Sequence, residues 1–243
     1  MDISVISTAR QAQGIDFGGK IAVVIDVLRA TSVITTALEN GAREVVPVKT
    51  IEEARNLYAQ CDAPTTLLGG ERNAVKIDGF NLGNSPLEYK KKTVEGKALI
   101  LTTTNGTNAI NNVKGADEVV LACFRNAEAV VRHLIETSQC GVSTNIIIVC
   151  AGTEGRFSLD DGLCAGMLIE SLKQRTEVEC DDLGLLLHHY YVENQCNLMG
   201  ALSGCHHLKR LFALGFYDDI KFCLEPNCVQ TVPVVKDGKI GRE

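Results

Sequence analysis

The sequence predicts an α/β protein folded as a three-layer α/β/α unit with a mixed, largely parallel sheet. Strand and helix patterns alternate along the chain with short connections, which is typical of βαβ units. Four apolar runs also stop abruptly at small, polar and charged residues, in the stretches 21–32, 66–73, 98–107 and 145–161. Because parallel strands end at one edge of their sheet, we expect the loops that follow these runs to converge on a common crevice.

The predicted elements follow one another in regular order. Residues 21–25 form a continuous apolar strand, Thr31 or Ser32 is expected to cap a helix that runs to about residue 40, and Gly41 is expected to end it. A strand at 44–48 and a helix at 51–60 come next. The long segment 73–84 is expected to be functional or mobile, and Ser85-Pro86 is expected to start a helix.

Further strands are expected at residues 99–101, 119–121 and 146–149. Helices are expected at residues 107–113, 127–135, 160–168, 183–191 and 203–214, the last of them closed by Gly215. The segment 229–235 reads as a strand followed by a turn at Asp237-Gly238, with Pro233 suited to an edge strand. With no repeat or linker, residues 1–243 are expected to form a single compact unit.

Composition excludes several classes of protein. The net charge of −6 argues against a nucleic-acid surface, and the basic triplet at residues 90–92 is expected to be a solvated helix face. No apolar run approaches the roughly 18 residues needed to span a bilayer, and the N-terminus lacks a signal-peptide pattern, so a cytoplasmic protein without membrane contact is expected. The ten cysteines form no C-x-x-C pair, so reduced thiols are expected and zinc is not.

Polar residues at the strand ends identify the candidate site. The crevice is expected to hold carboxylates, guanidiniums and a loop amide, namely Asp26, Arg29, Glu71, Arg72, Asn105, Arg156, Asp160 and Asp161. Such groups suit a metal ion and a strongly anionic small substrate. Asp26 and Arg29 have a plainer interpretation as a helix cap and its salt-bridged partner. Of the adjacent Asp160 and Asp161, only one is expected to face the crevice, and Asp161 is preferred.

Two loops suggest anion binding. The stretch Thr102 to Thr107 offers hydroxyls, an amide and a glycine before a helix, although it also fits an ordinary turn. Cys150 and Arg156 fit the C-x5-R spacing of cysteine-dependent phosphatases, but no histidine precedes Cys150 and Glu154 adds negative charge, so Cys150 is interpreted as strand packing. The pairs His188-His189 and His206-His207 are interpreted as surface or interface residues.

Five strings in this order resemble the 2-phosphosulfolactate phosphatase family, which is associated with coenzyme M biosynthesis. They are DVLRATS (26–32), GGERN (69–73), GFNLGNSP (79–86), TTTNGT (102–107), and CAG, FSLDD and CAG within 150–166. The resemblance covers nearly the whole chain. It implies a magnesium-dependent phosphatase with an α/β/α fold that hydrolyses 2-phospho-3-sulfolactate to 3-sulfolactate and phosphate.

The chemistry of the residues gives the roles expected within such a site. Asp26, Arg29 and Asp161 are expected to be catalytic, with Mg²⁺ held by Asp26, Asp161 and Glu71. The substrate is expected to contact Arg72, Asn84, Thr103, Thr104, Asn105, Gly106, Thr107, Gly152 and Arg156. Water is the preferred nucleophile. A cysteine-dependent phosphatase using Cys150 and Arg156, or a non-catalytic binding protein for an anionic metabolite, are the alternatives, and the last third of the chain suggests a homodimer face.

Overall fold

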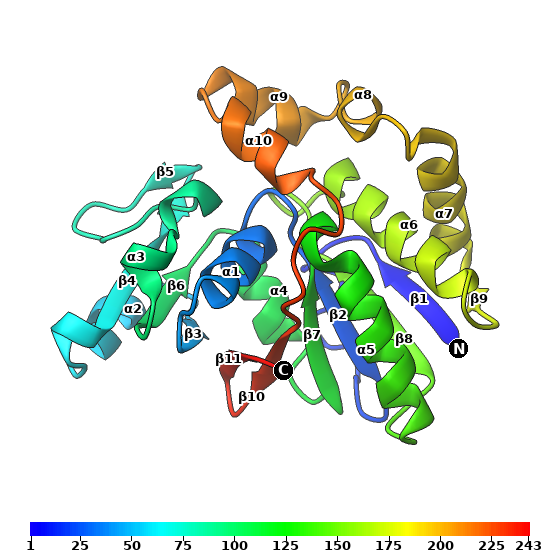
Figure 1. Cartoon of the computed structure of the whole chain (residues 1–243), viewed down its shortest axis with the longest axis horizontal. Helices are drawn as coiled ribbons and strands as arrows, with labels where there is room; N and C mark the ends of the chain where they lie inside the picture. The colour runs from blue at the N-terminus through cyan, green and yellow to red at the C-terminus, as the bar shows by residue number, and fades with distance from the viewer.

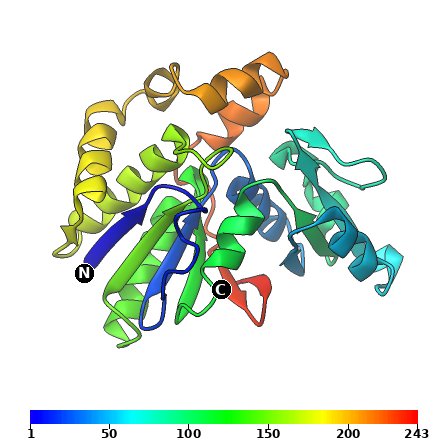
Figure 2. The same ribbon diagram turned by 180° about the vertical axis from the view of Figure 1, so that it is seen from behind.

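The structure is a computed structural model that describes all residues, 1–243. It has one mixed, mostly parallel sheet of eleven strands in the order β5-β4-β6-β3-β11-β10-β7-β2-β8-β1-β9. Helices lie on both sides of the sheet: α5 covers the face seen in Figure 1, and α4 covers the face seen in Figure 2. The predicted three-layer α/β/α class is therefore confirmed.

The elements have the following bounds. The strands are β1 Asp2–Ile6, β2 Ile21–Ile25, β3 Glu44–Pro47, β4 Thr66–Arg72, β5 Val75–Lys76, β6 Ala98–Thr102, β7 Glu118–Ala122, β8 Asn145–Cys150, β9 Glu179–Cys180, β10 Pro233–Lys236 and β11 Lys239–Arg242. The helices are α1 Ala30–Glu39, α2 Ile51–Tyr58, α3 Lys91–Val94, α4 Gly106–Asn112, α5 Ala127–Gln139, α6 Leu159–Lys173, α7 Asp182–Asn194, α8 Leu198–Ala201, α9 His206–Ala213 and α10 Tyr217–Cys223.

The central strand β2 shows why the sheet needs cover on both faces. All five of its residues are buried, and successive side chains of a strand point to opposite faces. Ile21, Val23 and Ile25 belong to the apolar core that includes residues of α5 and α6. Ala22 and Val24 belong to a second core, which includes residues of α1 and α4. An uninterrupted apolar run at 21–25 thus marks a strand buried on both sides.

The C-terminal hairpin divides the sheet into two groups of parallel strands. Strands β4, β6 and β3 form one group, and β7, β2, β8 and β1 form the other. Hairpin β10–β11 lies between them and pairs antiparallel with β7 and with β3, in each case through a single residue pair. Three successive antiparallel pairings make the two groups run in opposite directions. Figure 1 shows them side by side, with the hairpin between them.

Three local predictions were wrong for identifiable reasons. Helix α1 has no side-chain cap at its N-terminal residue, because the hydroxyls of Thr31 and Ser32 donate back to the carbonyls of Asp26 and Val27. Ser85-Pro86 starts only a 3₁₀ turn over Pro86–Glu88, since the Ser85 hydroxyl bonds a distant carboxylate. Pro233 lies inside the sheet, where it is tolerated as the first residue of its strand.

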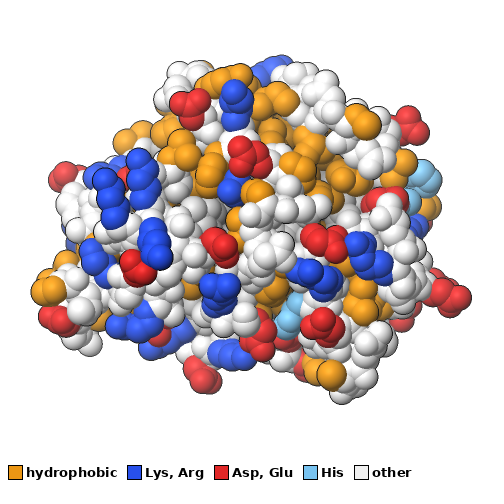
Figure 3. Space-filling view, in the orientation of Figure 1, with side chains coloured by type: hydrophobic (Ala, Val, Ile, Leu, Met, Phe, Trp, Pro, Cys, Tyr) orange, Lys and Arg blue, Asp and Glu red, His pale blue; other side chains and the backbone are white.

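Several short elements escaped prediction, namely β1, β5, β9, β11, α8 and α10. Other expectations were met: all ten cysteines are free, and Lys90, Lys91 and Lys92 are exposed. None of the helices combines the length and apolar character that crossing a bilayer requires. On the face shown in Figure 3, Lys and Arg side chains gather on the side where Figure 1 places β5 and α3.

Candidate active site

A polar cavity of about 80 Å³ lies where loops from both groups of strands meet. It is lined by Asp26, Leu28, Arg29, Glu71, Asn73, Ala74, Asn84, Thr103, Thr104, Asn105, Thr153, Glu154, His207, Arg210 and Leu211. The loops after β2 and β8 come from one group, and those after β4 and β6 come from the other. The predicted convergence of strand ends is therefore real, although the carboxyl ends belong to two oppositely directed groups instead of one parallel sheet.

Asp26 is the buried carboxylate at the end of β2. Its Oδ1 accepts the Ala30 N–H at 3.1 Å, so the capping interpretation is partly right, while its side chain also lines the cavity. Burial raises the pKa of Asp26 to about 6, with the Ala30 N–H and His207 acting in the opposite direction and Asp160 and Glu71 adding to the rise. A carboxylate held among other carboxylates gains from a bound cation.

Glu71 fixes two loops at the cavity wall. Its Oε1 accepts the Thr104 N–H and its Oε2 accepts the Ala74 N–H, each at 2.7 Å. Two hydrogen bonds close the loop between β6 and α4. The Thr107 N–H donates to Thr103 Oγ1, and the Thr107 hydroxyl donates to the Thr103 carbonyl. Thr103, Thr104 and Asn105 line the cavity, whereas Thr107 lies outside its lining and stabilises the loop through these bonds.

Gly106 allows this loop to approach Asp26. A Cβ atom at Gly106 would stand 2.5 Å from the Ala30 Cβ and 2.6 Å from Asp26 Oδ2. Both separations are far below a normal contact, so only glycine fits between α4 and the β2–α1 junction. The close backbone approach predicted for this glycine occurs, but Gly106 contacts a protein carboxylate and is not itself among the residues that line the cavity.

Arg29, the residue just before α1, lines the cavity and is held by the C-terminal segment that carries α10. Its guanidinium pairs with the buried Asp219 of α10, lies over the ring of Phe216 at 3.9 Å, and donates to the Ala74 carbonyl at 3.2 Å. Ser85 donates to the other oxygen of Asp219 at 2.6 Å. The predicted salt bridge of Arg29 therefore exists, but its partner is Asp219 and not Asp26.

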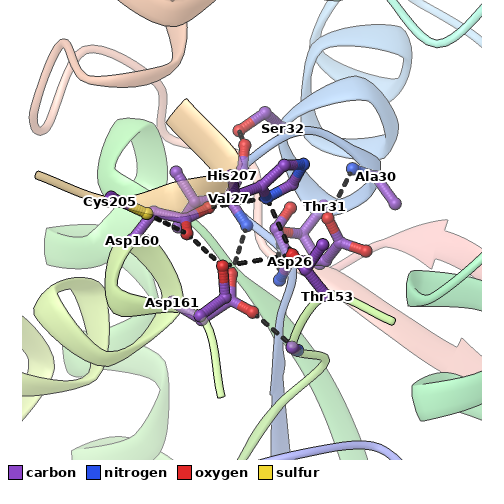
Figure 4. A network of polar contacts seen from close by, with 12 residues as sticks. Asp26, Val27, Ala30, Thr31, Ser32, Thr153, Asp160, Asp161, Cys205 and His207 are labelled. Atoms are coloured by element: carbon purple, nitrogen blue, oxygen red, sulfur yellow. Dashed lines mark hydrogen bonds and ion pairs between the residues drawn. The ribbon is translucent and has the colours of Figure 1, made fainter. Parts of the chain in front are cut away.

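Asp160 and His207 form a buried ion pair beside Asp26 (Figure 4). His207 Nδ1 lies 3.7 Å from Asp160 Oδ2 and 2.9 Å from Thr153 Oγ1, while the Ser158 hydroxyl donates to Asp160 Oδ1. Burial acts to raise the pKa of Asp160, but His207 and Ser158 outweigh it and lower that pKa. Burial acts to lower the pKa of His207, but Asp160 and Asp26 outweigh it and raise that pKa. Both directions favour the charged pair.

One of the adjacent Asp160 and Asp161 was expected to face the cavity, with Asp161 preferred, but neither residue lines it. Asp161 Oδ1 accepts the Val27 N–H and Asp161 Oδ2 accepts the Gly152 N–H, both at 2.9 Å (Figure 4). Asp161 therefore ties the β2 and β8 loops together. Gly152 was expected to bind substrate, but its N–H donates to the Asp161 carboxylate and the residue does not line the cavity.

The predicted metal cluster is not assembled as such. No group of three or more His, Cys, Asp and Glu side chains stands ready to hold an ion, so Asp26, Glu71 and Asp161 do not form a three-ligand site. The reason lies in their hydrogen bonds, since Glu71 and Asp161 each use both carboxylate oxygens on backbone N–H groups. Only Asp26 and Glu71 of the three line the cavity.

Arg72 and Arg156 also lie outside the cavity lining. Arg72 donates to the carbonyls of Glu71 and Lys49 and to the Thr102 hydroxyl, which makes it a brace between loops. Arg156 is exposed and lines a neighbouring hollow. Cys150 is completely buried, and this burial, followed by the charges of Asp161 and Asp160, raises the pKa of its thiol well above the usual value. Cys150 and Arg156 thus lack the arrangement of a thiolate nucleophile and its anion clamp.

Sequence reasoning missed the contribution of α9, and in the loop after β8 it chose Gly152 and Arg156 instead of Thr153 and Glu154. His207, Arg210 and Leu211 come from α9, and Thr153 and Glu154 come from the loop after β8. Arg210 pairs with Glu154, which joins the two elements across the cavity mouth. His207 and Arg210 are spaced by three residues on one helix face, a signal present in the sequence. Nothing in the sequence indicated that this face covers the strand ends.

The fold and cavity define an α/β protein that gathers arginines, a histidine and carboxylates around a small polar space, as an enzyme acting on a small anion requires. The profile of the 2-phosphosulpholactate phosphatase family matches residues 6–238, and the chain belongs to this family. A relative from Caldanaerobacter subterraneus subsp. tengcongensis, named a probable 2-phosphosulfolactate phosphatase, is 49% identical over 92% of this chain and 90% of its own.

Two further relatives carry the same name. The Thermotoga maritima protein is 47% identical over 90% of each chain. The Clostridium perfringens strain SM101 protein is 43% identical over 99% of this chain and 96% of its own. The resemblance inferred from the motif strings is thereby confirmed.

Proposed function

We propose that this chain hydrolyses 2-phospho-3-sulfolactate to 3-sulfolactate and phosphate, with Mg²⁺ as its cofactor. The proposal rests above all on one observation: Asp26, Arg29, Arg210 and His207 line the same small cavity. Family membership and the names of the relatives support the substrate. The reaction transfers a phosphoryl group to water, so catalysis consists mainly of positioning and charge neutralisation.

The oxygen atoms presented at the cavity fit a hard divalent cation. Asp26 Oδ2 has no hydrogen-bond partner, and the buried Asn84 Oδ1 is likewise an acceptor without a donor. Mg²⁺ prefers such oxygen ligands and needs only one or two carboxylates, the rest of its shell being water. We therefore assign Asp26 and Asn84 to the cation, with Glu71 beside them. When bound, the cation would neutralise phosphoryl charge next to these carboxylates.

The remaining residues divide between binding and proton transfer. Arg29 and Arg210 face the cavity with guanidinium groups that suit phosphate oxygens. His207 carries a raised pKa because Asp160 and Asp26 outweigh the effect of its burial, and this shift favours its protonated form. We assign His207 to donate that proton to the oxygen that leaves phosphorus as the 2-hydroxyl of sulfolactate forms. Asp160 and Thr153 orient its ring.

Charge balance favours catalysis with a cation over simple anion binding. The cavity is lined by the carboxylates of Asp26, Glu71 and Glu154 as well as by three basic side chains. A protein that only bound a multiply charged anion would gain nothing from acidic groups at its site, since buried like charges repel one another. The acidic residues are explained if a divalent cation accompanies the substrate.

Phosphate release from 2-phospho-3-sulfolactate tests the proposal. Purified protein is assayed as isolated, with excess EDTA, and after Mg²⁺ is restored. We expect turnover that EDTA abolishes and Mg²⁺ restores. Turnover that EDTA does not affect would contradict the role of the cation, and binding of the substrate without any turnover would favour the binding-protein alternative.

We further propose that the protein acts in the cytoplasm in coenzyme M biosynthesis, and that it is a homodimer. The metabolic assignment follows from the family resemblance. The dimer is supported by large apolar side chains that α7 leaves exposed, Leu185 and Leu186. Light scattering on the eluting protein tests the dimer, and a monomer mass at micromolar concentration would refute it.

A further inference from the structure

The proposed substrate carries three anionic groups, a phosphate, a carboxylate and a sulfonate, on a three-carbon chain. The cavity gathers two arginines and a histidine, which suit the phosphoryl group. Two hollows share lining residues with the cavity, so they are the candidate places for a second anionic group of the same substrate.

One of these hollows is basic, and we call it the Arg10–Lys49 hollow. It measures about 390 Å³ and is lined by Ala9, Arg10, Gln13, Lys49, Thr104, Asn105, Asn108, Asn112, Ala151 and Gly155. It contains two cations, several amides and no acidic side chain. Thr104 and Asn105 line both this hollow and the catalytic cavity, so the two spaces adjoin at these residues. In a chain of net charge −6, a concave surface with this lining favours an anion.

Hydrogen bonds fix the backbone around Arg10 and Lys49, but neither side chain has an ionic partner. The Ala9 N–H donates to the Ala151 carbonyl at 3.0 Å, and the Asn112 side chain donates to the Ala9 carbonyl at 2.8 Å, which fixes the segment carrying Arg10. The Lys49 N–H donates to Glu53, and the Lys49 carbonyl accepts from Arg72. Neither the Arg10 guanidinium nor the Lys49 ammonium takes part in a salt bridge.

Asn105 adds a donor at the junction of the two spaces. It is half-buried, and neither its side chain nor its backbone N–H has a hydrogen-bond partner, whereas the neighbouring Thr104 N–H is occupied by Glu71. A group entering the Arg10–Lys49 hollow from the cavity passes this amide. Asn105 therefore offers a free amide that borders both the catalytic cavity and the hollow with the two cations.

The other adjoining hollow is less suited to an anion. Its lining includes apolar Phe157 and Leu159, the Cys205 thiol, the two histidines His206 and His207, and the guanidinium of Arg156, whose charge the Glu154 carboxylate opposes. Because an acidic side chain and apolar surface both disfavour a second negative group, the basic hollow is the better destination for it.

We propose that Arg10 and Lys49, with Asn105, form the subsite that binds the sulfonate of the substrate and so selects phosphorylated sulfonates over phosphate esters without one. This inference rests on the proposed function. The two cations lie outside the reacting centre, so they act on substrate binding and leave the chemical step to the cavity.

The test compares the R10Q/K49Q double variant with wild type on two substrates, 2-phospho-3-sulfolactate and 2-phospholactate, which lacks the sulfonate. We expect the double variant to raise KM for the sulfonate substrate by at least about 10-fold with little change in kcat, because it loses charged hydrogen bonds. For 2-phospholactate we expect kcat/KM to stay within about 2-fold. The matched control is K92Q, which changes an exposed lysine that does not line the hollow.

An equal loss on both substrates, or no loss on either, would overturn the subsite. If wild type releases phosphate from neither compound, the proposed function fails, and calorimetry with 3-sulfolactate then decides the subsite alone. Binding by wild type that the double variant weakens would uphold it. Absent or unchanged binding would refute it.

Discussion

At the scale of single residues, the Asp160–His207 pair is the most informative feature of the site. Its two members come from α6 and α9, more than forty positions apart, and both have pKa shifts that keep them charged. His207 and Asp26 line the same cavity, but the partners of His207 are Asp160 and Thr153 and not Asp26. A proton donor and a candidate cation ligand therefore lie in one cavity with different partners.

His207→Gln should reveal the proton donor through the pH profile. A raised pKa means that His207 keeps its proton above pH 6.5, so wild-type kcat should fall as pH rises through this higher value. We expect the variant to lose about 10²- to 10⁴-fold in kcat and to lack this alkaline limb. His189→Gln, an exposed histidine on α7, is the control. An unchanged limb in His207→Gln would exclude the role.

The sequence allowed about half of the cavity lining to be predicted, because those residues directly follow buried strands. Asp26, Glu71 and the loop beginning at Thr103 are in this class. Of the adjacent Asp160 and Asp161, one was expected to face the cavity, but neither lines it: Asp161 binds two backbone N–H groups and Asp160 pairs with His207. His207 required knowledge of how α9 folds over the strand ends, and that depends on tertiary packing.

At the scale of elements, the close contact between α4 and α1 determines where Asp26 stands. Gly106 opens α4 so close to Ala30 and Asp26 that an added Cβ would overlap both, which brings the β6 loop and the β2 loop together. The strand and helix pattern predicted both elements. The sequence indicated only that a glycine in this loop permits a close backbone approach. It did not show that the approaching atoms belong to Ala30 and Asp26.

Gly106→Ala should disturb stability and activity together. The added methyl group has no room beside Ala30 and Asp26, and overpacking of this kind costs about 1–3 kcal/mol. We expect a Tm lower by roughly 2–12 °C, at about 2–4 °C for each kcal/mol, together with slower phosphate release. Gly204→Ala, where a Cβ meets nothing within 4 Å, should change neither. A wild-type Tm for Gly106→Ala would contradict the close packing.

At the scale of the whole molecule, the active cavity belongs to both groups of strands and to the C-terminal helices. The C-terminal hairpin joins the groups through single residue pairs on each side, and α10 reaches Arg29 through Asp219. The alternation of strands and helices predicted the α/β/α class, but it gave no sign of the reversed direction. That reversal depends on strands β10 and β11, which come last in the chain and insert in the middle of the sheet.

The central claim is that phosphoryl transfer occurs at Asp26 and does not involve Cys150. The most direct measurement is phosphate release from 2-phospho-3-sulfolactate by Asp26→Asn and Cys150→Ala, assayed beside wild type with Tm recorded for each. We expect Asp26→Asn to lose about 10²- to 10³-fold in kcat/KM. Its Tm should not fall, because Asn still accepts the Ala30 N–H and removes a buried charge beside Glu71. Cys150→Ala should stay active. An active Asp26→Asn, or a folded but inactive Cys150→Ala, would contradict the claim.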